Sequence, residues 1–200
     1  DGDWSSDLCS SDLKMGKVIT LKPLKSLKIG IIITGSEVYY GRIEDRFAKV
    51  LKEKMKFYGC TITKIIYAPD NKEKIEEGIK SLIDNGAEVV IATGGMSVDA
   101  DDVTPIAIKN VSDRVISYGT PALPGNMLML AYLKNVAILG IPGAGMYFKT
   151  TSFDLIFPRI LAGEKLEKKD ITSLAHGGLC LMCKNCTYPV RSEERRVGKE

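Results

Sequence analysis

Three short runs of apolar residues, each followed by a polar loop, constrain the fold of this chain most strongly. The runs lie at 28–33, 61–67 and 88–92 and are rich in β-branched side chains. Continuous apolar runs of this length are typical of strands buried on both faces of a parallel sheet. Between them, 43–58 and 72–84 repeat apolar residues every three or four positions, which predicts amphipathic helices. This alternation indicates an α/β domain with right-handed crossovers.

Two later apolar runs, at 127–133 and 136–141, predict an antiparallel hairpin. They are joined by Lys134-Asn135, and Asn tolerates the positive φ that a two-residue turn requires. Residues 127–133 are also compatible with a helix. A last helix is expected over about 146–161, with inward contacts from Phe148, Phe153, Ile156, Phe157 and Ile160. The fold class is therefore a three-layer α/β sandwich with a mostly parallel sheet plus an antiparallel hairpin.

The composition of the 200 residues is that of an ordinary globular chain, with 44% hydrophobic and 26% charged residues. No apolar stretch approaches the ~20 residues that a membrane helix needs. The formal net charge is +3, which favours an anionic small molecule or a weak nucleic-acid patch as ligand. No run resembles a signal peptide, so we expect a reducing, cytoplasmic location and no disulfides.

The segment from Thr93 to Pro105 carries the clearest functional signal. A buried strand ends in Gly94-Gly95, and paired glycines let backbone N–H groups approach an anion. A helix is predicted to start at Thr104-Pro105, with the Thr104 hydroxyl as its N-cap. Such a helix start favours phosphate binding. Asp102, just before it, is placed either to interact with the helix dipole or to hold a metal ion.

This segment resembles the Thr-Gly-Gly motif of the molybdopterin-binding family, which includes molybdopterin adenylyltransferases, molybdenum insertases and the amino-terminal part of competence-damage-inducible proteins. In that family an aspartate followed by x-Thr lies nine residues after the first position of the motif, and Asp102 lies nine residues after Thr93. Three other regions resemble family loops: Thr34-Gly35-Ser36-Glu37-Val38, with Ser36 in place of an acid; Pro69-Asp70-Asn71; and Leu123-Pro124-Gly125 with Ile141-Pro142-Gly143. The resemblance spans about 28–163.

The resemblance implies a set of ligand-binding residues and two catalytic carboxylates. Molybdopterin carries a phosphate, or a pyrophosphate when adenylylated, which Gly94, Gly95 and Ser97 would bind. Asp70 and Asp102 would act in catalysis by holding Mg²⁺. The full implied cofactor-binding set is Thr34, Gly35, Ser36, Glu37, Thr93, Gly94, Gly95, Met96, Ser97, Thr104, Pro124, Gly125, Pro142 and Gly143.

A second motif near the end of the chain suggests a different metal. Cys180, Cys183 and Cys186 are each separated by two residues, a spacing that brings three sulfur atoms toward one centre. They fit an iron–sulfur cluster completed by a further cysteine, or Zn²⁺ with His176 as fourth ligand. An exposed thiol-rich tail is the plainer alternative. A similar Cys-rich extension occurs in clostridial-type members of the resembled family.

These observations divide the chain into five segments. Residues 1–13 repeat Ser-Ser-Asp-Leu without strand or helix periodicity, and they resemble translated sequencing adapter, as do 191–200. Residues 14–27 are expected to be a linker or the end of a missing N-terminal domain. The molybdopterin-binding domain is expected at 28–165, and the Cys-rich tail at 166–190.

The resemblance implies a role in molybdenum cofactor biosynthesis with Mg²⁺-dependent insertase-like or adenylyltransferase-like chemistry. The small-molecule partners would be the pterin with ATP or molybdate. We expect a homo-oligomer and neither a nucleic-acid nor a membrane partner. Two alternatives remain at this stage: a non-enzymatic pterin sensor or carrier, and a nucleotide-salvage relative of the same fold.

Overall fold

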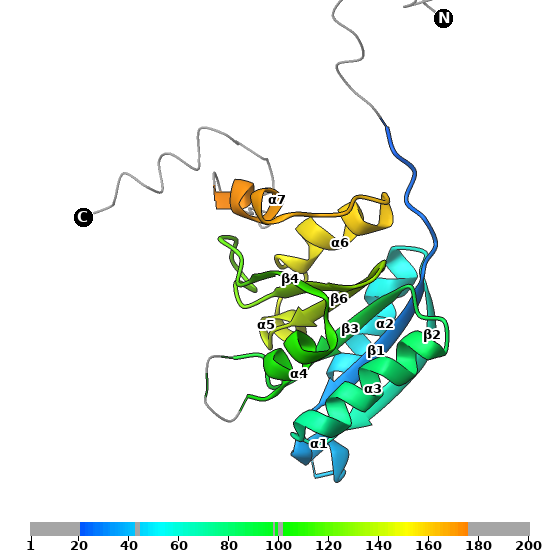
Figure 1. The fold of residues 1–200 in the computed structure, drawn as a ribbon, viewed down its shortest axis with the longest axis vertical. Helices are drawn as coiled ribbons and strands as arrows, with labels where there is room; N and C mark the ends of the chain where they lie inside the picture. Colours follow the sequence, from blue (N-terminus) through cyan, green and yellow to red (C-terminus); the bar gives the residue numbers. More distant parts are fainter. Residues whose placement is uncertain (1–20, 43–44, 98, 100–101, 176–200) are drawn as a thin grey trace, which may run out of the picture.

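The computed structural model describes residues 21–42, 45–97, 99 and 102–175 (Figure 1). Within these residues the strands are β1 (Lys28–Thr34), β2 (Thr61–Ala68), β3 (Val89–Thr93), β4 (Arg114–Tyr118), β5 (Met129–Leu133) and β6 (Val136–Ile141). The helices are α1 (Ser36–Tyr39), α2 (Phe47–Phe57), α3 (Lys72–Asp84), α4 (Thr104–Val111), α5 (Ala144–Tyr147), α6 (Phe153–Leu161) and α7 (Lys168–Thr172), followed by a 3-10 turn at Ser173–Ala175. No helix in the described ranges is both long and apolar enough to cross a membrane.

The strands form one sheet in the order β2-β1-β3-β6-β5-β4. β1 pairs in parallel with β2 and β3, and β3 pairs in parallel with β6. β5 runs antiparallel to both of its neighbours. The expected mostly parallel sheet with an antiparallel hairpin is confirmed, and residues 127–133 do not form a helix. Because the four parallel strands point the same way, their carboxyl ends lie along one edge of the sheet.

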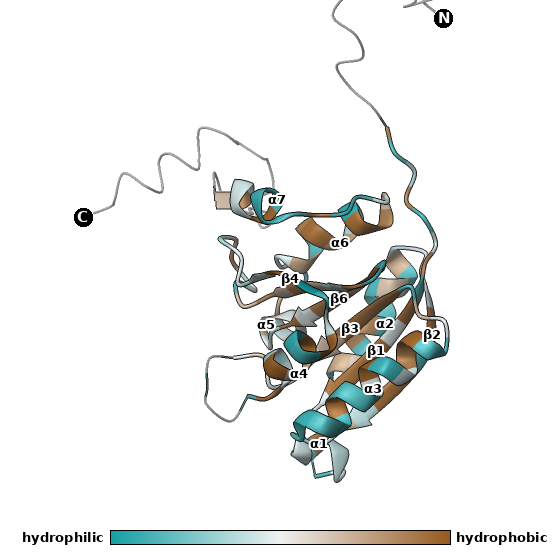
Figure 2. Cartoon of the chain, viewed as in Figure 1, coloured by the Kyte–Doolittle hydropathy of each residue, from teal (hydrophilic) through white to brown (hydrophobic). Residues whose placement is uncertain are grey.

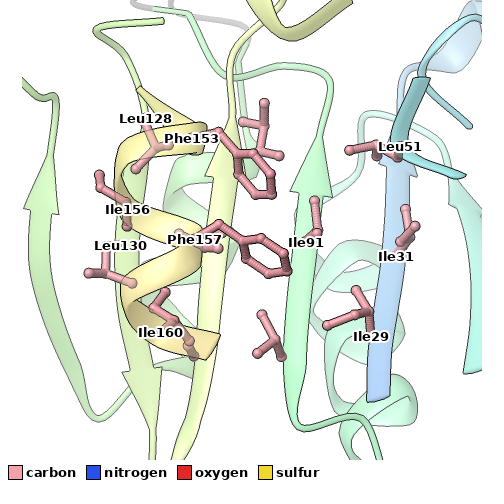
Figure 3. Packing of buried hydrophobic residues seen from close by; sticks show 14 of the residues in the cluster. Ile29, Ile31, Leu51, Ile91, Leu128, Leu130, Phe153, Ile156, Phe157 and Ile160 are labelled. Carbon is pink, nitrogen blue, oxygen red and sulfur yellow. The ribbon is translucent and has the colours of Figure 1, made fainter. Parts of the chain in front are cut away.

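Helices cover both faces of this sheet and complete the three layers. β1 sends Ile29, Ile31 and Ile33 to one face, where α2 and α6 pack, and it sends Ile32 to the other face, where α3 and α4 pack. Figure 3 shows the α6 rings of Phe153 and Phe157 lying over the strands beside Ile91 and Ile31; the rings are stacked with centroids 4.7 Å apart. In Figure 2 the apolar colour is concentrated on the strands and the polar colour on the outer side of α3. The α/β sandwich is thus confirmed.

The helix expected over 146–161 is wrong in extent, because the chain forms two helices there with a break between them. Phe148 ends α5 and is 49% exposed rather than an inward contact. The start of α6 is fixed by hydrogen bonds of the break: the Thr151 amide donates to Oδ2 of Asp154 (2.9 Å), and the Ser152 amide donates to the Pro124 carbonyl (2.9 Å). These contacts hold the chain away from a continuous helix.

Three other details differ from the sequence-based expectation. The helix expected from Ile43 begins at Phe47 in the described residues. β4 is an additional edge strand that the sequence pattern did not indicate. In the β5–β6 hairpin Lys134, not Asn135, takes the positive φ (54°), and its amide donates to Oδ2 of Asp113 (2.6 Å).

Packing also continues past the expected domain boundary at residue 165. Leu166 and Ile171 are 1% and 2% exposed and belong to the core cluster on the α6 face. The Leu166 amide donates to the phenol oxygen of Tyr132 (3.1 Å). The first part of the segment assigned to the Cys-rich tail is therefore integrated into the domain.

Candidate functional site

The family-like loops meet at the edge formed by the carboxyl ends of β1, β2, β3 and β6. The loop that contains Pro124 and Gly125 reaches the same edge, because Tyr118 pairs with Met129 and Met129 pairs with Gly140. Figure 1 shows α1 and the segment leading into α4 at this edge. In open parallel sheets, ligands bind outside the carboxyl ends of the strands. We therefore treat this edge as the candidate site.

Three buried threonines form the floor of the site. Thr34, Thr93 and Thr104 are 3%, 0% and 0% exposed. Oγ1 of Thr34 lies 2.9 Å from Oγ1 of Thr104 and 3.3 Å from the Thr93 carbonyl oxygen, and the Thr93 hydroxyl donates to the Ile141 carbonyl (3.2 Å). These bonds tie together the ends of β1, β3, β6 and the start of α4.

The role expected for Thr104 as N-cap is wrong. Thr104 is the first residue of α4, Val103 precedes it as the cap residue, and no side chain caps this helix start. The Thr104 hydroxyl instead binds Thr34 across the site. Since the Thr34 hydroxyl has one proton, which it donates to the Thr93 carbonyl, the Thr104 hydroxyl is the donor in the pair.

The Gly94-Gly95 turn lies directly on this floor. Gly94 has φ +94°, and a Cβ built on it would overlap the carbonyl oxygen of Thr34. Gly95 has φ +50°, and a Cβ there would lie 3.1 Å from Oγ1 of Thr104 and 3.4 Å from Oδ1 of Asp102. A side chain at Gly95 would thus crowd oxygen atoms of Thr104 and Asp102, while Gly94 permits the close approach of the turn to Thr34.

The two carboxylates of the site are each fixed by a backbone amide. Oδ2 of Asp102 accepts from the Ser97 amide at 2.7 Å, and Oδ2 of Asp70 accepts from the Ser36 amide at 2.7 Å. The Asp70 amide donates in return to Oγ of Ser36 (3.2 Å). This reciprocal pair gives Ser36 a clear local role at the position where the resembled family has an acid.

Asp70 follows β2, and Asp102 lies just before α4. The part of the chain that the structure describes holds no group of three or more His, Cys, Asp or Glu side chains that could bind a metal by themselves. Mg²⁺ commonly uses one or two carboxylates and takes its other oxygens from phosphate and water. In each of the two carboxylates the bond from the backbone amide goes to Oδ2, so Oδ1 is the oxygen that could bind a metal ion.

The remaining predicted loops line the β6 and α6 side of the edge. Gly125 has φ +93° and packs against Thr151 and Ser152 at the start of α6; the Ser152 hydroxyl donates to the Gly125 carbonyl. Pro142 and Gly143 follow β6 directly and lead into α5. Glu37 is exposed on α1. All fourteen predicted cofactor-binding positions therefore lie along one edge of the sheet or in the loops next to it.

The structure adds two residues that sequence reasoning missed. Tyr118 at the end of β4 donates from its phenol to the Ser97 carbonyl (2.8 Å), and Ser152 anchors the Pro124-Gly125 loop. Burial and the nearby charge of Asp102 raise the pKa of Tyr118, so the phenol stays protonated. Neither residue belongs to a sequence motif. His176, Cys180, Cys183 and Cys186 lie outside the described residues.

Comparison with known protein families identifies the family of this chain. Residues 30–162 match the family model MoCF_biosynth, described as "Probable molybdopterin binding domain". The chain belongs to this family. Membership supports a general role in molybdenum cofactor biosynthesis and agrees with the family that the sequence motifs resemble.

Curated relatives match over a shorter segment. A CinA-like protein of Mycolicibacterium gilvum is 33% identical over 89 residues, which is 44% of this chain and 21% of the relative. A CinA-like protein of Mycolicibacterium paratuberculosis is 30% identical over 115 residues, 56% of this chain and 26% of the relative. The aligned part thus spans about a quarter or less of these relatives.

Solved structures share the fold at low identity. The molybdopterin biosynthesis enzyme MoaB of Thermus thermophilus superposes with a TM-score of 0.59 at 17% identity, covering 69% of this chain and 98% of that chain. The tungsten cofactor synthesizing protein MoaB of Pyrococcus furiosus gives 0.57 at 20% identity, with 69% and 94% coverage. A molybdopterin biosynthesis MoeA protein of a Pyrococcus species gives 0.54 at 24% identity, covering 35% of that larger chain.

Proposed function

We propose that this chain binds molybdopterin, or its adenylylated form, and carries out a Mg²⁺-dependent step of molybdenum cofactor biosynthesis. The observation that carries the proposal is the glycine turn itself, where Gly95 lies against side-chain oxygens of Thr104 and Asp102 at the same sheet edge as Asp70. A glycine turn, a helix start and two fixed carboxylates are the elements that a phosphate with its metal ion requires.

Each group has a separate task in this proposal. The Gly94-Gly95 backbone would approach the phosphate, since Gly94 lets the turn lie against Thr34 and Gly95 has no Cβ to crowd Thr104 and Asp102. The Ser97 amide is engaged by Asp102, so its hydroxyl is the group we assign to the ligand. Asp70 and Asp102 would hold Mg²⁺ from two sides of β1. When bound, Mg²⁺ would neutralise phosphate charge and help orient the substrate.

The reaction needs no nucleophile from the protein under this proposal. The site would position the pterin phosphate against its co-substrate, which is ATP for adenylyl transfer or molybdate for insertion. Positioning and charge neutralisation contribute most of the catalysis in phosphoryl chemistry of this kind. The pterin ring would extend toward the Pro124-Gly125 and Pro142-Gly143 loops.

A nucleotide-salvage role stays an untested alternative. That alternative rested on Pro69-Asp70-Asn71, but Asn71 caps α3, with its Oδ1 accepting from the Lys74 amide at 2.9 Å. The Asn therefore has a local structural function. A pterin sensor or carrier without catalysis keeps the same binding site and differs only in turnover.

The decisive experiment combines binding and turnover with Asp102→Asn. We expect the wild-type chain to bind molybdopterin in calorimetry and, with Mg²⁺ and ATP or molybdate, to form adenylylated pterin or release AMP from it. Asp102→Asn should remove turnover while the thermal melting curve stays near that of wild type. Asp84→Asn, an exposed change at the end of α3, is the matched control. Tight binding without turnover in wild type would assign the carrier role, and absence of pterin binding would refute the proposal.

A further inference from the structure

Tyr118 lies on the edge strand β4 and contacts the residues that follow the glycine turn. It is the last residue of β4, and β5 and β6 lie between β4 and β3, which carries the turn. Its phenol nevertheless lies 2.8 Å from the Ser97 carbonyl oxygen and 3.4 Å from the Met96 carbonyl oxygen. Met96 and Ser97, in the loop after β3, therefore contact a side chain of the edge strand β4, although two strands separate β3 from β4.

These two carbonyls belong to the peptide groups on either side of Ser97. The Met96 carbonyl and the Ser97 amide share one planar peptide unit, so fixing the direction of the carbonyl also fixes the direction of the N–H. That N–H donates to Oδ2 of Asp102 at 2.7 Å. A continuous connection thus runs from the Tyr118 phenol through the Ser97 backbone to the Asp102 carboxylate.

We infer that Tyr118 is a positioning residue that holds Asp102 in place through the backbone of Ser97. It is not assigned a contact with substrate. Its phenol has one proton, which it donates mainly to the Ser97 carbonyl at 2.8 Å, and the Met96 carbonyl at 3.4 Å shares it more weakly. Tyr118 itself lies on a strand, which gives this side chain a fixed base. That Tyr118 fixes the Ser97 backbone does not depend on the proposed function. That this contact affects Mg²⁺ binding at Asp102 rests on the proposed function.

Amide hydrogen exchange of Ser97 tests the backbone part directly. Tyr118→Phe keeps the ring and removes only the hydroxyl, so the fold is preserved. We expect Ser97 exchange to become about 3- to 10-fold faster, the range that loss of one hydrogen bond gives. Tyr67→Phe is the control: Tyr67 is 43% exposed against 41% for Tyr118, lies on the opposite edge strand β2, and donates to Asp45 rather than to the site. Unchanged Ser97 exchange in Tyr118→Phe would overturn the inference.

The dependence of pterin binding on Mg²⁺ tests the connection to Asp102. In Tyr118→Phe the Mg²⁺ concentration for half-maximal molybdopterin binding should rise about 3- to 10-fold, with the same maximal binding at saturating Mg²⁺. In an Asp102→Asn background the Phe substitution should have no further effect. An equal effect in both backgrounds would show that Tyr118 acts independently of Asp102 and would refute the connection. If wild-type binding proved independent of Mg²⁺, the proposed function would fail, while the exchange comparison would still decide the role of Tyr118.

Discussion

Gly94 and Gly95 are neighbours, yet the structure gives them different tasks. Gly94 lets the backbone lie against Thr34, and any side chain there would collide with the β1 carbonyl. Gly95 instead lies next to side-chain oxygens of Thr104 and Asp102, which a Cβ would crowd. Substitution at Gly94 should therefore disturb the fold of the turn, whereas substitution at Gly95 should mainly displace these two side chains.

Gly95→Ala should weaken molybdopterin binding roughly tenfold or more, because the new methyl group would crowd Oγ1 of Thr104 and Oδ1 of Asp102 and shift them. The positive φ of 50° should also reduce the free energy of unfolding by about 1 kcal/mol. Gly86→Ala separates the two effects, since Gly86 also has positive φ (83°) but a Cβ there would meet no atom within 4 Å. Calorimetry with equal affinity in both variants would contradict the assignment of Gly95 to the ligand site.

For individual residues, the sequence indicated which of them gather at the site, but it did not indicate their hydrogen bonds. The glycine turn, Asp102 and Asp70 were predictable because strand ends and turns have local signals. The partner of Thr104 was not, because it lies on β1, 70 residues earlier, and only folding brings the two hydroxyls together. Tyr118 was missed for the same reason: its acceptors are backbone carbonyls of a loop 21 residues away.

The strands that were predictable from the sequence have continuous apolar or β-branched runs. β1 and β3 have almost every residue buried and were recognised from their apolar runs. β4 is a five-residue edge strand with only Ile116 buried, so it lacks the alternation that identifies a half-buried strand. The α5–α6 break was hidden because Phe148 and Phe153 are both large and apolar, although only Phe153 enters the core.

An ion pair joins α2 to the start of α6, next to the residue that anchors the Pro124-Gly125 loop. Nζ of Lys54 lies 2.7 Å from Asp154, and each side chain is 13% exposed. Asp154 also accepts from the Tyr58 phenol and from the Thr151 amide, next to the Ser152 anchor of Gly125. Burial of the ring, together with the charge of Asp154, raises the pKa of Tyr58, so the phenol remains a donor to this carboxylate.

Lys54→Met should reduce the free energy of unfolding by about 3 kcal/mol, because it leaves the Asp154 carboxylate without its counter-charge in a mostly buried place. Lys52→Met, an exposed change on the same helix, should have little effect. Denaturant unfolding of both variants gives the comparison. Equal stability of the two would mean that the ion pair contributes no net stabilisation.

A second charged cluster connects α6 to α7. Arg159 contacts Glu164 through Nε (2.8 Å) and Asp170 through a terminal guanidinium nitrogen (3.0 Å). Hydrogen bonds from the Glu167 backbone and then from Arg159 lower the pKa of Asp170, and the bond from Arg159 lowers that of Glu164. A carboxyl group with a lowered pKa in the folded state stabilises the fold above its unfolded pKa and loses that contribution as pH falls through the folded pKa.

Arg159→Gln should therefore lower the melting temperature at pH 7, and this effect should become smaller as the pH falls to 3 and approaches the lowered pKa values of Glu164 and Asp170. Melting curves of wild type and variant at pH 7, 5 and 3 measure this convergence. A difference in melting temperature that stayed constant over the whole range would show that Arg159 acts through packing of its alkyl chain rather than through charge.

Considered as a whole, the packed domain is larger than the segment that defines its family. The family match ends at residue 162, but Leu166 and Ile171 continue the core on the α6 face. Tyr132 receives a hydrogen bond from Leu166, which fixes the chain as it leaves α6. The Cys-rich motif therefore follows α7 and the turn at Ser173–Ala175, a short distance along the chain from the packed core.

This placement allows the metal prediction for Cys180, Cys183 and Cys186 to be tested against the domain itself. A chain ending at Ala175 keeps every core residue of the described domain, so it should melt at the same temperature as the full chain and bind molybdopterin equally well. After anaerobic reconstitution and metal analysis, only the full chain should hold metal. Stoichiometric zinc without iron would indicate three cysteines with His176, and a stable four-iron cluster would require a further ligand. Equal metal content in the two chains would show that the bound metal belongs to the domain and would refute a metal site at the three cysteines.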